Sequence, residues 1–154
     1  MSPSAVPTPA QLLALDRLLT LSPHNSFLGM KLESAKDNRL SVSLPLRDEL
    51  IASEPGRMVH GGVISSILDT SCSLAVMLRL GKLIRVSTLD MRLDYLREVP
   101  AEGTLHSRSS CYRLTDQMAF VRGIAFTIDK DGTEDKVAKA AASFLVIHQQ
   151  RVAV

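Results

Sequence analysis

Residues 59–76 place a single carboxylate inside a long apolar run. The segment reads VHGGVISSILDTSCSLAV, and Asp69 is its only acidic residue. Apolar and small side chains recur there at the spacing of one helix face: Ile64, Ile67, Leu68, Ser71, Leu74, Ala75 and Leu78. This stripe predicts a long helix that packs on a sheet. Because an unpartnered buried carboxylate is costly, Asp69 is expected to be either well hydrogen-bonded or functional.

The opposite face of this predicted helix is unusually poor in charge. It carries Gly62, Ser65, Ser66, Asp69, Ser73 and Val76, of which Asp69 alone is ionisable. A face covered by water normally carries more charged residues, and small side chains let a backbone or a ligand approach closely. We therefore expect a second subunit to cover this face, which predicts at least a homodimer.

The other predicted elements surround this helix. A short helix over residues 8–21 has Thr8 as its N-cap, and strands are predicted at residues 27–32 and 39–46, separated by the turn sequence AKDN. A loop runs from Pro45 to about Val59. Beyond Gly81, four strands follow one another: LIRVSTLDMRLDYL, GTLHSRSSCYRL, MAFVRGIAFTI and KVAKAAASFLVIH. The order predicts an α+β fold in which an antiparallel sheet wraps one long central helix.

Length and composition narrow the protein class. With 154 residues, the chain suits one compact domain, here predicted over residues 23–150 after an N-terminal lead and short helix at 1–22. The 18 basic and 16 acidic side chains are scattered and the aromatic fraction is 4%, which argues against nucleic acid as a partner. Asp69, Arg79 and several hydroxyls argue against a membrane span. Two cysteines without metal-ligand or disulfide spacing favour the cytoplasm and predict no metal site.

Alternation along the first strand after the helix assigns its two faces. Alternate side chains of a strand point to opposite faces, so an inward row is expected at Ser87, Leu89, Met91, Leu93 and Tyr95. The polar set at Thr88, Asp90, Arg92 and Asp94 is then the solvent face. The alternation predicts that Ser87 presents a hydroxyl near the central helix, where it either bonds the backbone or serves a site.

The HGG sequence at residues 60–62 stands directly before the predicted helix. Backbone N–H groups at a helix start have no partner within the helix, and they lie at the positive end of its dipole. Such an end can hold a developing oxyanion. Asp69 follows about two turns later on the same side as Gly62. A bound carbonyl on these amides could therefore meet the carboxylate, although HGG alone is more often a tight turn.

These motifs resemble the hotdog-fold acyl-CoA thioesterases, in the branch similar to the phenylacetate-degradation thioesterases. The segment GRMVHGGVISSILDT has the family's HGG and an acidic residue nine positions after the histidine, with one extra residue between Gly56 and His60. The segment HNSFLGMKL also resembles the family's opening segment, and VSTLDMRLDYLREVPAEG looks like the family's next strand. Ser87 matches the Ser or Thr that helps to place the water or the carboxylate in the family.

The resemblance implies hydrolysis of an acyl-CoA thioester at a dimer interface, with dimers pairing into a tetramer and without metal or cofactor. Gly61 would offer its amide to the thioester oxygen, and Asp69, from the opposing helix, would act as general base or as nucleophile. His60 would support the loop or contact the thioester. The small residues Gly62, Ser65 and Ser66 would line the substrate.

Glu54 departs from the family pattern. Six residues before the histidine, the family commonly has Asn or Gln followed by Pro, whereas this chain has Glu54 and Pro55. A glutamate donates a hydrogen bond to a carbonyl only when it is protonated, which a neighbouring Asp69 carboxylate would favour. Glu54 is therefore expected either to join the site in that form or to point away from it.

Two other functions stay open. A hotdog hydratase or dehydratase would need a histidine paired with an acid to move protons at adjacent carbons, an arrangement that His60 beside the glycines does not resemble. A non-catalytic acyl-CoA-binding domain would keep the fold without turnover. The presence of Asp69 disfavours this second alternative, and Glu54 leaves it open.

Overall fold

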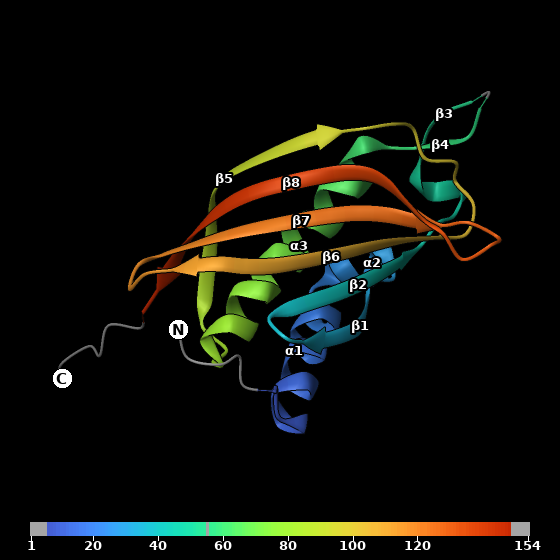
Figure 1. Ribbon diagram of the computed structural model, residues 1–154. Helices are drawn as coiled ribbons and strands as arrows, with labels where there is room; N and C mark the ends of the chain where they lie inside the picture. The colour runs from blue at the N-terminus through green and yellow to red at the C-terminus, as the bar shows by residue number, and fades with distance from the viewer. Residues whose placement is uncertain (1–5, 55, 149–154) are drawn as a thin grey trace.

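The computed structural model describes residues 6–54 and 56–148. A six-stranded antiparallel sheet in the order β1-β2-β6-β7-β8-β5 curves around one long helix, α3 (Figure 1). In chain order the elements are α1 (Pro9–Leu21), α2 (Pro23–Leu28), β1 (Lys31–Lys36), β2 (Arg39–Pro45), the 3-10 helix η1 (Asp48–Leu50), β3 (Ile51–Ser53), β4 (Met58–Val59), α3 (Gly61–Leu80), β5 (Arg85–Tyr95), β6 (Thr104–Leu114), β7 (Met118–Ile128) and β8 (Glu134–Ile147). The predicted α+β architecture is confirmed.

The central helix α3 packs into the concave side of the sheet. The predicted apolar stripe is buried as far as Ala75, while Leu78 is only partly buried against the core. Val76 is fully buried, so its predicted place on the outward face is wrong. The helix has the length and the mean hydropathy, 1.5, of a candidate membrane span, yet half of that window is buried inside the domain, as in the core helix of a soluble protein.

The N-terminal region differs from the prediction in one element. α1 begins as expected, because the Thr8 side chain accepts a hydrogen bond from the Gln11 N–H and the Gln11 side chain accepts one from the Thr8 N–H. The strand predicted at 27–32 is shifted toward the C-terminus and forms β1, which starts at Lys31. A short helix, α2, takes its first residues: it starts at Pro23 and ends at Leu28, and Gly29, with a φ of 72°, is its left-handed C-cap.

The four strands predicted after Gly81 are confirmed as β5 to β8. The predicted loop between Pro45 and Val59 contains more structure than expected, namely η1 and the small β3–β4 hairpin. This hairpin leads directly into α3, and the His60 N–H donates to the carbonyl of Leu50 at 2.8 Å. The start of the central helix is thus tied to η1.

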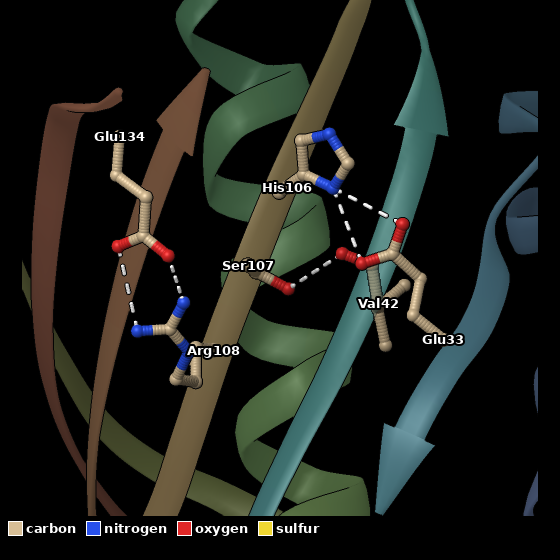
Figure 2. A network of polar contacts seen from close by, with 6 residues as sticks. All are labelled: Glu33, Val42, His106, Ser107, Arg108 and Glu134. Carbon is tan, nitrogen blue, oxygen red and sulfur yellow. Dashed lines mark hydrogen bonds and ion pairs between the residues drawn. The ribbon is translucent and has the colours of Figure 1, made fainter. Parts of the chain in front are cut away.

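The outer face of the sheet is polar and carries cross-strand polar contacts (Figure 2). His106 on β6 pairs with Glu33 on β1, and Arg108 on β6 pairs with Glu134 on β8. The intervening Ser107 is buried, and its hydroxyl donates to the carbonyl of Val42. The alternation of β6 therefore separates a charged outer row from an inner row that packs toward α3.

Candidate functional site

His60 caps the start of α3 with its own side chain. It is the N-cap residue, and its Nδ1 atom accepts a hydrogen bond from the Gly62 N–H at 2.9 Å. Its carbonyl accepts a second bond from the Val63 N–H at 2.9 Å. Because Nδ1 acts as an acceptor, this nitrogen carries no proton in the capped state. His60 thereby satisfies two of the N–H groups that a helix start leaves open.

The Gly61 N–H stays available at this helix start. The N–H groups of its neighbours Gly62 and Val63 both donate hydrogen bonds to His60. The Gly61 N–H, in contrast, donates to no acceptor in the described part of the chain. The positive end of the α3 dipole lies at the same place. Gly61 therefore presents one free donor that suits a carbonyl oxygen gaining negative charge.

Asp69 lies on the partly buried outward face of α3, where a residue of β5 bonds its carboxylate. The Thr88 hydroxyl on β5 donates to its Oδ1 atom at 2.8 Å. Within residues 6–54 and 56–148, Oδ2 accepts no hydrogen bond. The carboxylate is thus held by one oxygen while the other is free to meet water or an electrophilic carbon.

The predicted inward orientation of Ser87 is wrong, and its neighbour Thr88 takes that place. The pairing of β5 with β8 shifts register between Thr88 and Asp90, so Leu89 is an extra residue in a β-bulge. The bulge reverses the alternation. Residues up to Thr88 therefore have the opposite parity from Met91, Leu93 and Tyr95, and Ser87 is an exposed residue on the face away from Asp69.

Ser65 and Ser66 both use their hydroxyls within the helix. Each donates to the carbonyl of Gly62, at 2.9 and 2.8 Å respectively. The Ser66 hydroxyl also lies 3.2 Å from Nε2 of His24 on α2. Gly62 and Ser66 line an open groove of about 470 Å³ beside the helix start, with apolar side chains from Leu28, Leu50 and Val63.

Glu54 is not brought to Asp69 within the subunit. Its side chain is 68% exposed in the β3–β4 hairpin and forms an ion pair with Arg57 at 3.6 Å. Arg57 also pairs with Asp48, and this hydrogen-bonded carboxylate raises the pKa of the arginine. Of the two outcomes expected for Glu54, the geometry of one subunit fits a side chain that points away from the site.

Three site residues escaped the sequence prediction. Thr88 was predicted on the solvent face of its strand, because the residue pattern does not reveal the bulge. Tyr95 was placed on the inward face, but its contact was not foreseen: the hydroxyl donates to the carbonyl of Gly61 at 3.1 Å. His24 lies between the predicted helix at 8–21 and the predicted strand at 27–32, where no element was predicted, since a helix of six residues carries too little periodicity to detect.

Comparisons with known proteins agree on one family. Residues 56–133 match the family model of the thioesterase superfamily. The chain is 33% identical over 126 residues to a Halobacterium salinarum protein named as an esterase, covering 79% of this chain and 82% of that protein. It is 29% identical over 161 residues to the medium/long-chain acyl-CoA thioesterase YigI of Escherichia coli, covering 93% and 99% of the two chains.

Solved structures give the same fold. A protein of the thioesterase superfamily superposes with a TM-score of 0.79 at 29% identity and covers 90% of this chain and 99% of its own. The PaaI protein of the Escherichia coli phenylacetic acid degradation operon has a TM-score of 0.75 at 15% identity, with coverage of 90% and 95%, and shares the fold. The chain belongs to the thioesterase superfamily and is a thioester hydrolase with the predicted hotdog fold.

Proposed function

We propose that this chain hydrolyses acyl-CoA thioesters, with Asp69 as the reacting carboxylate and the Gly61 N–H as the donor to the thioester oxygen. The observation that carries the proposal is the Asp69 carboxylate, which Thr88 holds by one oxygen on the same helix that begins with an open Gly61 donor. The similarity to YigI, named as a medium/long-chain acyl-CoA thioesterase, supports the substrate class.

Two routes through Asp69 balance the reaction. As general base, the carboxylate takes a proton from water while the water oxygen bonds to the thioester carbon. The tetrahedral intermediate then expels the CoA thiolate, which is protonated, and leaves the free acid. As nucleophile, the carboxylate itself bonds to that carbon and expels the thiolate, and water then cleaves the mixed anhydride. In both routes the Gly61 N–H and the helix dipole stabilise the negative oxygen.

The spacing within one helix favours a site shared by two subunits. Gly61 and Asp69 are eight residues apart, which corresponds to about 12 Å along the helix axis. A donor and a nucleophile that act on one thioester carbonyl are only about 7 Å apart. A second α3 that runs antiparallel to the first would bring its own Asp69 closer to this Gly61. We therefore assign each site one Gly61 and the partner's Asp69.

The edge strand β5 supports the dimer in this proposal. It is one of the two outer strands of the sheet, and an unpaired edge is a template for another strand. Three large aliphatic side chains on and beside β5 are about half exposed: Leu83, Leu89 and Leu96. Pairing of β5 with its copy would cover them and place the two α3 helices side by side. The predicted tetramer would form by packing of such dimers.

Release of free CoA tests the proposal against its alternatives. A panel of phenylacetyl-, butyryl-, octanoyl- and palmitoyl-CoA is offered with a chromogenic thiol reagent, and we expect saturable thiol release. The protein's own background is small, because burial raises the pKa of Cys72 to about 12 and also raises that of Cys111. Binding without release would instead indicate a non-catalytic domain. Crotonyl-CoA, offered in the same assay, tests the hydratase alternative, because loss of its enoyl absorbance without thiol release would indicate hydration.

Thr88→Val is expected to lower kcat by about tenfold, because a hydrogen bond to a charged group contributes about 1.5–3 kcal/mol and here fixes the reacting carboxylate. The substitution keeps the side-chain shape and removes only the hydroxyl. Ser87→Ala is the matched control, and steady-state CoA release should stay within twofold of the natural protein. Loss of activity in Ser87→Ala but not in Thr88→Val would contradict the observed β5 register.

A further inference from the structure

The peptide group between Gly61 and Gly62 is held at both of its polar atoms. The Tyr95 hydroxyl donates to its carbonyl at 3.1 Å, and His60 Nδ1 accepts its N–H at 2.9 Å. Figure 1 shows how this arises, since the end of β5, where Tyr95 lies, is beside the beginning of α3. The tyrosine ring is 3.6 Å from the position that a Cβ atom on Gly61 would occupy.

This restraint acts on two successive glycines. Glycines at a helix start lack side chains that limit their dihedral angles, so their conformation depends on the bonds made by their peptide groups. His60 belongs to the same segment, where its N–H bonds the carbonyl of Leu50 in η1. Tyr95 is anchored instead on β5, which pairs with β8 along its full length through Tyr95↔Ala138. The tyrosine therefore links the glycine turn to the sheet.

We infer that Tyr95 is a positioning residue for thioester hydrolysis and one wall of the pocket that receives the thioester carbonyl. This inference rests on the proposed role of the Gly61 N–H. Tyr95 acts on that donor through the adjoining peptide, whose carbonyl it bonds. The Tyr95 side chain is also accessible to substrate, since it is 51% exposed in the subunit. Its ring lies against Gly61, the residue that presents the donor.

The expected effect falls on turnover more than on substrate binding. An oxyanion donor must already be aimed at the oxygen of the transition state, and a mobile donor stabilises that state less. The ground-state carbonyl binds such a donor weakly, so misalignment of the Gly61 donor changes KM little. If Tyr95 were purely structural, its substitution would instead lower the melting temperature and the amount of folded protein, without a fall in kcat at constant KM.

Tyr95→Phe tests the inference because it removes only the hydroxyl. We expect kcat for CoA release to fall about three- to tenfold, with KM within twofold and an unchanged melting temperature and oligomeric state. The chain offers one matched control: its second tyrosine, Tyr112, lies exposed and packs against Phe120 and Arg122. Tyr112→Phe should leave kcat unchanged. Equal kcat values in the two variants, or a fall that follows the melting temperature, would overturn the inference.

The absence of tryptophan from the sequence gives a direct readout of contact. In Tyr112→Phe, Tyr95 is the sole tyrosine and hence the dominant intrinsic fluorophore. An S-alkyl pantetheine thioether, first shown to inhibit hydrolysis competitively, should change this fluorescence saturably. The same titration of Tyr95→Phe should leave the Tyr112 signal constant. An inhibitor that binds without changing the Tyr95 signal would overturn the placement of Tyr95 at the pocket wall.

The controls separate this inference from the proposed function on which it rests. If the natural protein releases no CoA, or if Asp69→Asn keeps full activity, the proposed function fails. If the natural protein is active, Asp69→Asn is inactive and Tyr95→Phe behaves like Tyr112→Phe, only the role of Tyr95 fails.

Discussion

Asp69→Asn is expected to lower kcat for CoA release by about 10²–10⁴-fold, the range associated with loss of a general base. The amide has nearly the shape of the carboxylate and keeps an oxygen that can accept the Thr88 hydrogen bond. It can neither take a proton from water nor form a mixed anhydride with the acyl group. The fold and the binding of substrate should therefore persist while turnover is lost.

A neighbouring acid provides the control for this substitution. Asp90 follows the bulge on β5, is exposed, and lies on the other side of the strand from Met91. Asp90→Asn removes the same charge from the same part of the chain, so we expect kcat within twofold of the natural protein. If Asp69→Asn retains a third or more of the activity, another group performs the chemistry.

Mixing two inactive variants would reveal whether the site is shared. Gly61→Pro removes the one open N–H, and proline suits the first position of a helix, while the extended His60, at ψ 133°, suits the residue before a proline. In a mixed dimer of Gly61→Pro and Asp69→Asn, one site has both natural groups if they come from different subunits. Random exchange should then restore about a quarter of the activity. If both groups come from one subunit, mixing should restore none.

The elements that were predictable from sequence are the long ones. α3 and the strands β5 to β8 are each 11 residues or longer, and although the bulge in β5 reverses its alternation, their bounds match the prediction to within two residues. The region before α3 was less predictable because its elements are short. α2 has six residues and β4 has two, so turn residues such as Pro23 and Gly29 carry the signal that apolar spacing cannot.

The residues of the candidate site also differ in how far their positions could be predicted. His60, Gly61 and Asp69 belong to one helix, so their relative placement follows from local spacing alone. Thr88 reaches Asp69 only because β5 bulges against β8, and that register depends on residues more than 50 positions away in the chain. The direction of the Glu54 side chain depends on the conformation of the β3–β4 hairpin, in which it forms an ion pair with Arg57. Residue type and spacing thus singled out His60, Gly61 and Asp69, while non-local pairing decided which hydroxyl bonds Asp69.

Gly123→Ala is expected to destabilise the fold, although alanine normally suits a strand better than glycine. A Cβ atom at this position of β7 would lie 2.8 Å from Ser109 Oγ and 3.1 Å from both Cys72 Sγ and Leu68 Cδ2. Ser109 cannot move aside freely, because it is buried and its hydroxyl bonds Ser71 at 2.8 Å. Overpacking of this kind costs about 1–3 kcal/mol, which exceeds the roughly 0.5–1 kcal/mol gained by replacing glycine in a strand.

Thermal unfolding would measure this effect as a fall in Tm of about 3–8 °C for a domain of this size. Ala141→Val is a suitable control, since Ala141 is exposed on β8 and the added methyls face solvent. A double-mutant cycle identifies the cause: in a Ser109→Ala background, the nearest obstructing atom is gone and Gly123→Ala should cost at least about 0.5 kcal/mol less. An alanine variant that melts at or above the natural protein would show that α3 does not press against β6 and β7 as closely as the contacts at Gly123 require.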